Sequence, residues 1–123
     1  MKYLIALLGF LSVCFLWPIS SQAQEIHVFE GKRFTAKIIN NCPEGYVTCE
    51  DVTFSSRSKK TGKGITLKGR TVNINCPEVC DFRGYEFKNG NYTYSLLTND
   101  FNTWNLNVFE SGKVISSDSG TLQ

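Results

Sequence analysis

The chain has 123 residues, 41% of them hydrophobic, and a formal net charge of +2. This length excludes more than one ordinary domain, and a charge so close to neutral excludes a partner selected by overall charge. Alanine is absent after Ala36, whereas Thr, Asn, Val and aromatic residues are frequent, and no segment keeps apolar residues on one helical face for three turns. The composition therefore predicts an all-β protein.

Residues 1–23 have the pattern of an export signal. Its parts are one basic residue, an apolar run, a helix breaker and two small residues, namely Lys2, Leu4–Trp17, Pro18, and Ser21 with Ala23. Small residues at these last two positions are what a signal peptidase requires, so we expect cleavage before Gln24. The remaining chain, residues 24–123, is expected to be a single β domain with a charge near +1.

Two other interpretations of this segment are less well supported. The run Leu4–Trp17 is shorter than the roughly 18–20 apolar residues that a membrane span needs, so we expect no stable membrane anchor. Lipid attachment at Cys14 would require a small residue before it, and Val13 is not small. The pattern is typical of a Gram-negative export signal and predicts a periplasmic or secreted protein. In a secreted eukaryotic protein, Asn91 would instead be a glycan acceptor.

Export would leave four cysteines in an oxidising compartment, and these can pair in three ways: Cys42, Cys49, Cys76 and Cys80. Pairing in chain order is favoured because export delivers cysteines in that order. Cys42-Pro43-Glu44-Gly45 is also typical of a type I turn that would return the chain. The crossed pairing, Cys49 with Cys76 and Cys42 with Cys80, closes longer loops and would stabilise more. The spacing is not that of a zinc finger, and we expect neither metal nor cofactor.

The first half of the domain is expected to contain four strands. Short segments of alternating apolar and polar residues between turn residues indicate strands at Glu25–Glu30, Phe34–Asn40, Tyr46–Ser56 and Ile65–Asn75. The intervening segments are predicted turns or loops: Gly31-Lys32, Asn41–Gly45, Ser58–Gly64 and the cross-linked Cys76–Asp81.

A hairpin over Phe82–Leu97 is the best-defined element, because Asn89-Gly90 is the strongest short hairpin pattern. A two-residue loop at Asn89-Gly90 would pair Lys88 with Asn91 and Phe87 with Tyr92. One face would then carry the aromatic residues Tyr85, Phe87, Tyr92 and Tyr94. These rings are expected in the core; if the sheet were open, they would form a platform for stacking carbohydrate.

The C-terminal part predicts one further hairpin. Trp104, Leu106 and Val108 alternate with polar residues, and a tight turn at Ser111-Gly112 would pair Glu110 with Lys113. The polar tail Ser116–Gln123 is expected to fray. The whole is a small antiparallel meander of seven or eight strands. A closed or nearly closed barrel is preferred to a two-layer sandwich because closure removes sheet edges.

Residues that could support catalysis are few. His27 is the only histidine and is expected on the surface. Glu50 and Asp51 are adjacent on a predicted strand and would point to opposite faces, and the pair Glu78 and Asp81 supplies fewer ligands than calcium usually takes. The segment Gly64–Thr71 approximates a phosphate-binding loop but lacks its lysine and a following helix. We therefore do not expect an enzyme.

One segment, residues 57–70, contains six basic residues and no acidic one: Arg57, Lys59, Lys60, Lys63, Lys68 and Arg70. At the tip of a hairpin these side chains would attract an anionic partner, although a solvated loop kept soluble by lysine has the same composition. Export argues against nucleic acid as that partner.

These patterns predict an exported small binding protein that acts by protein–protein contact, of the inhibitor or immunity type. Its partner would be another envelope or secreted protein, and its contact edge would combine the loops Asn41–Tyr46 and Arg57–Gly64. A second hypothesis is an envelope-associated module that binds an anionic polymer or a carbohydrate through the basic tip and exposed rings. A third is an enzyme of unrecognised type.

Overall fold

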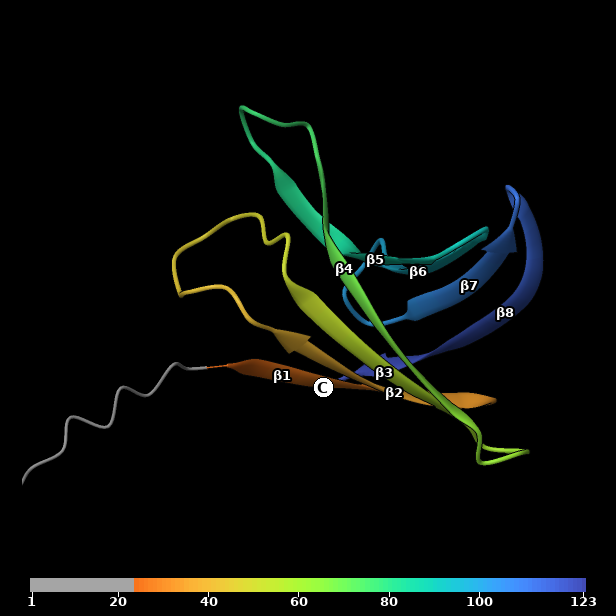
Figure 1. Cartoon of the computed structure of the whole chain (residues 1–123). Helices are drawn as coiled ribbons and strands as arrows, with labels where there is room; N and C mark the ends of the chain where they lie inside the picture. Colours follow the sequence, from red (N-terminus) through yellow and green to blue (C-terminus); the bar gives the residue numbers. More distant parts are fainter. Residues whose placement is uncertain (1–23) are drawn as a thin grey trace, which may run out of the picture.

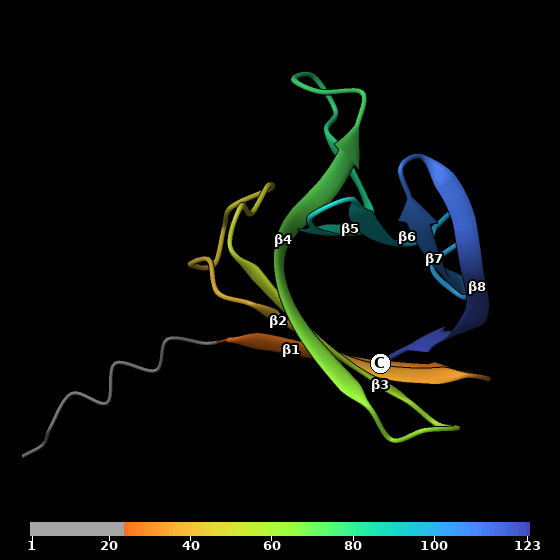
Figure 2. The same ribbon diagram turned by 45° about the vertical axis from the view of Figure 1, so that its right-hand side comes forward.

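The computed structural model describes residues 24–123, so the predicted export signal and Cys14 lie outside the described residues. Eight antiparallel strands follow one another in chain order around a closed barrel (Figures 1 and 2). Their bounds are β1 (Glu25–Gly31), β2 (Phe34–Asn40), β3 (Val52–Ser58), β4 (Gly64–Ile74), β5 (Asp81–Asn89), β6 (Tyr92–Thr98), β7 (Trp104–Glu110) and β8 (Lys113–Leu122). The predicted all-β meander and its closure are confirmed, and the sandwich alternative is wrong.

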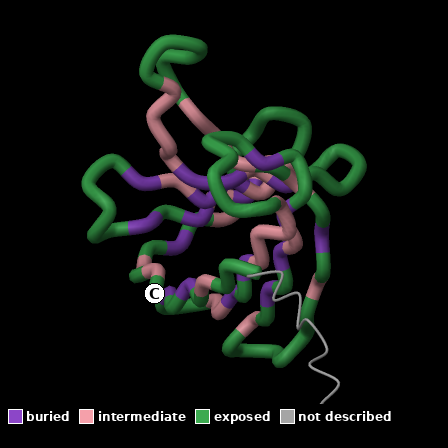
Figure 3. Tube along the Cα trace, turned by 90° about the vertical axis from the view of Figure 1, so that its left-hand side faces the viewer, coloured by how far each residue is buried: buried purple, intermediate pink, exposed green. Residues whose placement is uncertain are grey.

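The barrel interior is filled by the inward-facing residues of successive strands. Figure 3 shows buried positions alternating with more exposed ones along the strands, as a sheet with one face in the core requires. The largest fully buried side chains are Phe29, Phe54, Phe87, Ile38, Leu96 and Val52. The rings of Phe54 in β3 and Phe87 in β5 stack inside the barrel with their centroids 4.5 Å apart. The aromatic face of the hairpin is therefore core.

The barrel closes between its first and last strands, where the C-terminal tail was expected to fray. β8 extends to Leu122, pairing this residue with Phe29 and Gly120 with Gly31. Beyond the strand end, Val28 and Gln123 exchange two backbone hydrogen bonds of 2.8 and 3.0 Å. The prediction of a frayed tail is therefore wrong. The strand was overlooked because the inward positions of β8 are mostly polar residues or glycine, so its sequence lacks the apolar alternation of a core strand.

A buried carboxylate fastens this closure. Asp118, in β8, is only 6% exposed and accepts backbone N–H hydrogen bonds from Lys32, Arg33 and Phe34 at 3.1, 2.9 and 3.0 Å. A Cβ atom on Gly31 would collide with this carboxylate, so only glycine lets the β1–β2 turn approach so closely. Burial alone would raise the pKa of Asp118, but the surrounding backbone N–H groups outweigh it and lower that pKa below its ordinary value.

The two hairpin turns differ in how well their positions were predicted. At Ser111-Gly112 both residues have positive φ (50° and 82°), and Glu110 pairs with Lys113 as expected. The β5–β6 loop is Gly90-Asn91 rather than Asn89-Gly90, so Phe87 pairs with Tyr94. Gly90, with φ 59°, occupies the first central position, where a type II′ turn needs glycine. The register differs by two residues, which leaves every side chain on its predicted face.

The third strand is shorter than the predicted Tyr46–Ser56. β3 begins at Val52, and residues 46–51 belong to a loop closed by the Cys42–Cys49 disulfide. The turn within this loop is centred on Glu44-Gly45, and Gly45 has φ 92°. The type I turn predicted from Cys42 is therefore wrong: the turn lies one residue later, and Gly45 takes its second central position with the positive φ that a type II turn requires.

Replacing Asp118 with asparagine should destabilise the barrel. The amide side chain would keep one oxygen acceptor but lose the charge, leaving buried N–H groups poorly paired, so we expect the free energy of unfolding at pH 7 to fall by roughly 1–3 kcal/mol. Because the native pKa of Asp118 is lowered, its contribution is complete above the unfolded value of about 3.9 and is lost as pH falls through the native value. Urea denaturation at several pH values measures both effects.

Glu110→Gln is the matched control, since Glu110 is exposed and its charge should contribute little. The Asp118→Asn protein should lose less stability than the wild type on acidification below pH 4. An identical acid dependence in the two proteins would contradict the role assigned to Asp118.

Candidate functional site

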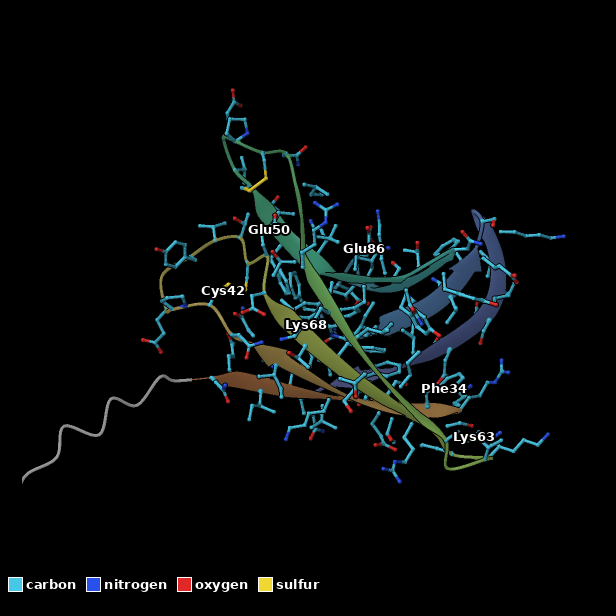
Figure 4. All side chains as sticks on the ribbon, in the orientation of Figure 1. Phe34, Cys42, Glu50, Lys63, Lys68 and Glu86 are labelled. Carbon is cyan, nitrogen blue, oxygen red and sulfur yellow. A yellow bond between two sulfur atoms is a disulfide. The ribbon has the colours of Figure 1, made fainter. Side chains whose placement is uncertain are left out.

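The predicted contact edge does not exist as one surface. Loop 41–51 precedes β3 and loop 59–63 follows it, so the two loops lie at opposite ends of the barrel (Figure 1). Figure 4 shows the same separation, with Cys42 and Glu50 at one end and Phe34 and Lys63 at the other. A single small partner surface contacting both loops is therefore excluded, and each end has to be considered by itself.

Both predicted disulfides are present and lie at one end, which we call the stapled end (loops 41–51 and 75–80). Cys42 pairs with Cys49 and Cys76 with Cys80, over sequence separations of 7 and 4. Pairing in chain order is confirmed, and the crossed pairing is wrong.

Hydrogen bonds join the two loops of the stapled end. The side-chain amide of Asn73 donates to the backbone oxygens of Val47 (3.2 Å) and Cys80 (3.1 Å), one in each loop. Thr71 in β4 also donates its backbone N–H to Cys49 at 2.8 Å, and the Thr71 hydroxyl accepts the N–H of Cys49 at 2.9 Å. The disulfides and these bonds make the two loops one connected surface.

The stapled end exposes apolar side chains among acidic ones. Tyr46 is 69% exposed and Val79 is 65% exposed, one on each loop, with Val47 and Ile74 also exposed. The two loops contain four acidic residues and no basic one: Glu44, Glu50, Asp51 and Glu78. The sequence analysis named loop Asn41–Tyr46 as a contact loop but missed its partnership with loop 75–80. Apolar residues inside short cysteine-bounded loops, where little can bury them, were a readable indication.

The six predicted basic residues do not form one tip. Lys59 pairs with Glu30 at 2.6 Å, Lys68 with Asp51 at 3.3 Å, and Arg70 with Glu86 at 3.8 Å. Lys68 and Arg70 lie further along β4, towards the stapled end, rather than in the connection. Within residues 24–123, the basic residues of this group without an ion pair are Arg57, Lys60 and Lys63, and they define what we call the basic end.

The aromatic hairpin face does not form a stacking platform. Tyr85 is 3% exposed and Phe87 is fully buried, whereas Tyr94 is half-buried and Tyr92 reaches the surface at the barrel rim. Burial, together with the nearby carboxylate of Glu25, raises the pKa of Tyr85 to about 12. A single exposed ring is too little surface to stack a sugar chain, so the carbohydrate hypothesis loses the residues on which it depended.

The described residues contain no group of three or more His, Cys, Asp or Glu side chains that could hold a metal ion. His27 lies 2.9 Å from the Glu25 carboxylate, on the exposed start of β1. The segment that approximated a phosphate-binding loop is continuous strand throughout β4. Residues 24–123 contain no helix that is long and apolar enough to cross a membrane.

Comparison of the chain with protein-family models, curated proteins and solved structures finds no match. The two ends of the barrel differ in chemistry and are the candidate functional surfaces.

Removing the Cys76–Cys80 bond by a Cys76→Ser/Cys80→Ser double substitution should leave the barrel folded. The bond closes a very short loop outside the core, so we expect the free energy of unfolding to fall by about 2 kcal/mol or less. Urea denaturation gives this value, and hydrogen exchange should show faster opening confined to residues 75–80. Cys42→Ser/Cys49→Ser is the comparison and should cost more, because Cys49 is buried in the core. Global unfolding of the first variant would contradict this account.

Proposed function

We propose that the protein is an exported binding protein of the inhibitor or immunity type, which contacts a protein partner through its stapled end. The observation that carries the proposal is the exposure of Tyr46, Val47 and Val79 on two disulfide-closed loops. Aromatic and apolar side chains that protrude from a surface are what central contact residues of protein interfaces look like.

The rigidity of the stapled end supports this role. Ordering a flexible loop on binding costs conformational entropy, which subtracts directly from affinity. Here the disulfides and the hydrogen bonds from Asn73 hold both loops before any partner arrives. A preformed surface of this kind favours tight binding by a small protein.

The charges of the stapled end indicate the kind of surface that its partner would have. Glu44 and Glu78 lie on the same two loops as the exposed apolar residues, and these loops contain no basic residue. Electrostatic complementarity therefore favours a partner with a basic rim around an apolar pocket that accepts Tyr46. Such a partner would be another exported protein, because two disulfides are consistent with an oxidising, periplasmic or extracellular location.

Tyr46→Ala should weaken partner binding strongly. A protruding aromatic ring at the centre of an interface contributes about 2 kcal/mol or more, so the dissociation constant should rise by roughly thirtyfold. The partner is first captured from periplasmic extract on immobilised protein and identified, and affinities are then measured with the purified pair.

Val114→Ala is the matched control, because Val114 is 51% exposed on β8, a strand that does not contribute to the stapled end. It should bind as the wild type does. Equal losses from both variants, or no loss from Tyr46→Ala, would contradict the proposal. Loss only after Lys60→Glu/Lys63→Glu would assign protein contact to the basic end instead.

The outer face of β2, β3 and β4 favours a second candidate function, the binding of an anionic polymer. A groove of about 310 Å³ contains two cations, Lys37 and Arg57, and the hydroxyl groups of Thr35, Ser55 and Thr66. In the strand register, Thr35 lies opposite Arg57 and Lys37 opposite Ser55. Cations beside hydroxyl donors suit phosphate or sulfate groups. Retention of the captured material by Tyr46→Ala, with loss in Arg57→Glu, would support this candidate over the first.

A further inference from the structure

The barrel is not packed along its whole length. At the basic end, a cavity of about 320 Å³ opens at the rim of the barrel, lined by residues of six strands and by Lys63. Its apolar lining consists mainly of Phe34, Ile65, Leu106, Val108 and Ile115. This volume is at the lower limit of the ~300–1,000 Å³ typical of small-molecule sites, which are usually lined by apolar side chains. Eight-stranded barrels have an interior that either fills with side chains or holds one small ligand.

Polar groups are placed within this apolar lining. Ser56, Ser116 and Tyr94 contribute hydroxyl groups from three different strands. Ser56 is buried within this lining. The ring of Tyr94 lies 6.0 Å from that of Phe54, which belongs to the packed core deeper in the barrel. A ligand in this cavity would therefore rest against the packed core and find hydroxyl groups beside it.

Cations lie beside the mouth of the cavity. Lys63 is part of the lining and lies at the same end as Phe34 (Figure 4). Arg33 is stacked on the Phe34 ring, with its guanidinium carbon 5.9 Å from the ring centroid. Two of the nearby acidic groups are engaged elsewhere: Glu30 with Lys59, and Asp118 with the β1–β2 turn. A third, Glu110, is exposed at the end of β7. An anionic headgroup would therefore be attracted by the cations next to the cavity, Lys63 and Arg33, rather than by a uniformly positive mouth.

We propose that this cavity binds a small single-chain amphiphile, with its apolar chain inside the barrel and an anionic headgroup, carboxylate or phosphate, at Lys63. This site is independent of protein binding at the stapled end, because the two lie at opposite ends of the barrel.

The test is a titration of the protein with octanoate, octyl phosphate and 1-octanol, followed by NMR of labelled methyl groups. Octanoate should shift the methyl resonances of Ile65, Leu106 and Val108, but not those of Val47 and Val79 at the stapled end. We expect a dissociation constant on the order of 1 mM or tighter. Uncharged octanol should bind about threefold more weakly, and comparison of the two anions identifies the preferred headgroup.

Two variants assign the site. Ser116→Leu places a larger side chain in the cavity and should weaken octanoate binding at least tenfold. Lys63→Gln should reduce octanoate affinity about threefold and leave octanol affinity unchanged. Lys60→Gln is its matched control, because Lys60 lies on the same loop outside the cavity lining and should have no effect.

The proposal is overturned if octanoate shifts no cavity methyl group, if it shifts both ends of the barrel equally, or if folded Ser116→Leu binds it unchanged. Equal affinities for octanoate and octanol, unaffected by Lys63→Gln, would overturn the anionic headgroup. If Ser116→Leu fails to fold, the wild-type methyl shifts and the pair Lys63→Gln and Lys60→Gln decide the question.

Discussion

The fold depends on one buried carboxylate. Asp118 projects from β8 to the interior of the barrel and takes three backbone N–H groups of the β1–β2 turn. These donors would otherwise be poorly paired near the core, where unpaired polar groups are costly. Gly31 and Gly120 face one another beside this carboxylate, and a Cβ atom on either would collide with its surroundings. The seam between β1 and β8 is short, with three residue pairs in register. It is nevertheless enough to close the barrel, because the hydrogen bonds of the Asp118 carboxylate add to the few backbone hydrogen bonds between these two strands.

Closure separates the loops into two chemically different ends. Because consecutive strands are antiparallel, alternate loops fall at the same end of the barrel. One set carries both disulfides, acidic residues and exposed Tyr46, Val47 and Val79. The other carries Lys63 beside an apolar mouth, with Lys60 on the same loop. The packed rings of Phe54 and Phe87 lie between these ends. The arrangement allows two binding surfaces of opposite charge on one small domain, which is why protein contact and ligand uptake are proposed for different ends.

Elements with a local pattern were predictable from the sequence. The β2 strand has the predicted bounds, the Ser111-Gly112 turn has the predicted register, and the cysteines pair in chain order. The part of β8 from Ser116 onwards was not predictable, because Ser116, Asp118 and Gly120 face inward and resemble a solvated tail. The alternation that suggested a strand from Tyr46 begins inside the loop closed by the Cys42–Cys49 disulfide. Residues 46–51 follow the geometry of this loop, and the strand begins only at Val52. The candidate site could not be predicted because it depends on contacts between residues far apart in the sequence. Examples are the ion pairs of Lys68 and Arg70, and the hydrogen bond from Asn73 to Val47. No local sequence pattern relates these residues.

Hydrogen exchange at the seam tests the account most directly. If Asp118 fastens a closed barrel, the backbone N–H groups of Lys32, Arg33 and Phe34, and those of Val28 and Gln123, should exchange far more slowly than in an unstructured peptide, because each is held in a hydrogen bond. Their protection at neutral pH should approach that of the central strands. Exchange of these five groups at the unstructured rate, while β3–β5 remain protected, would show an open sheet and contradict the closure on which both proposed surfaces depend.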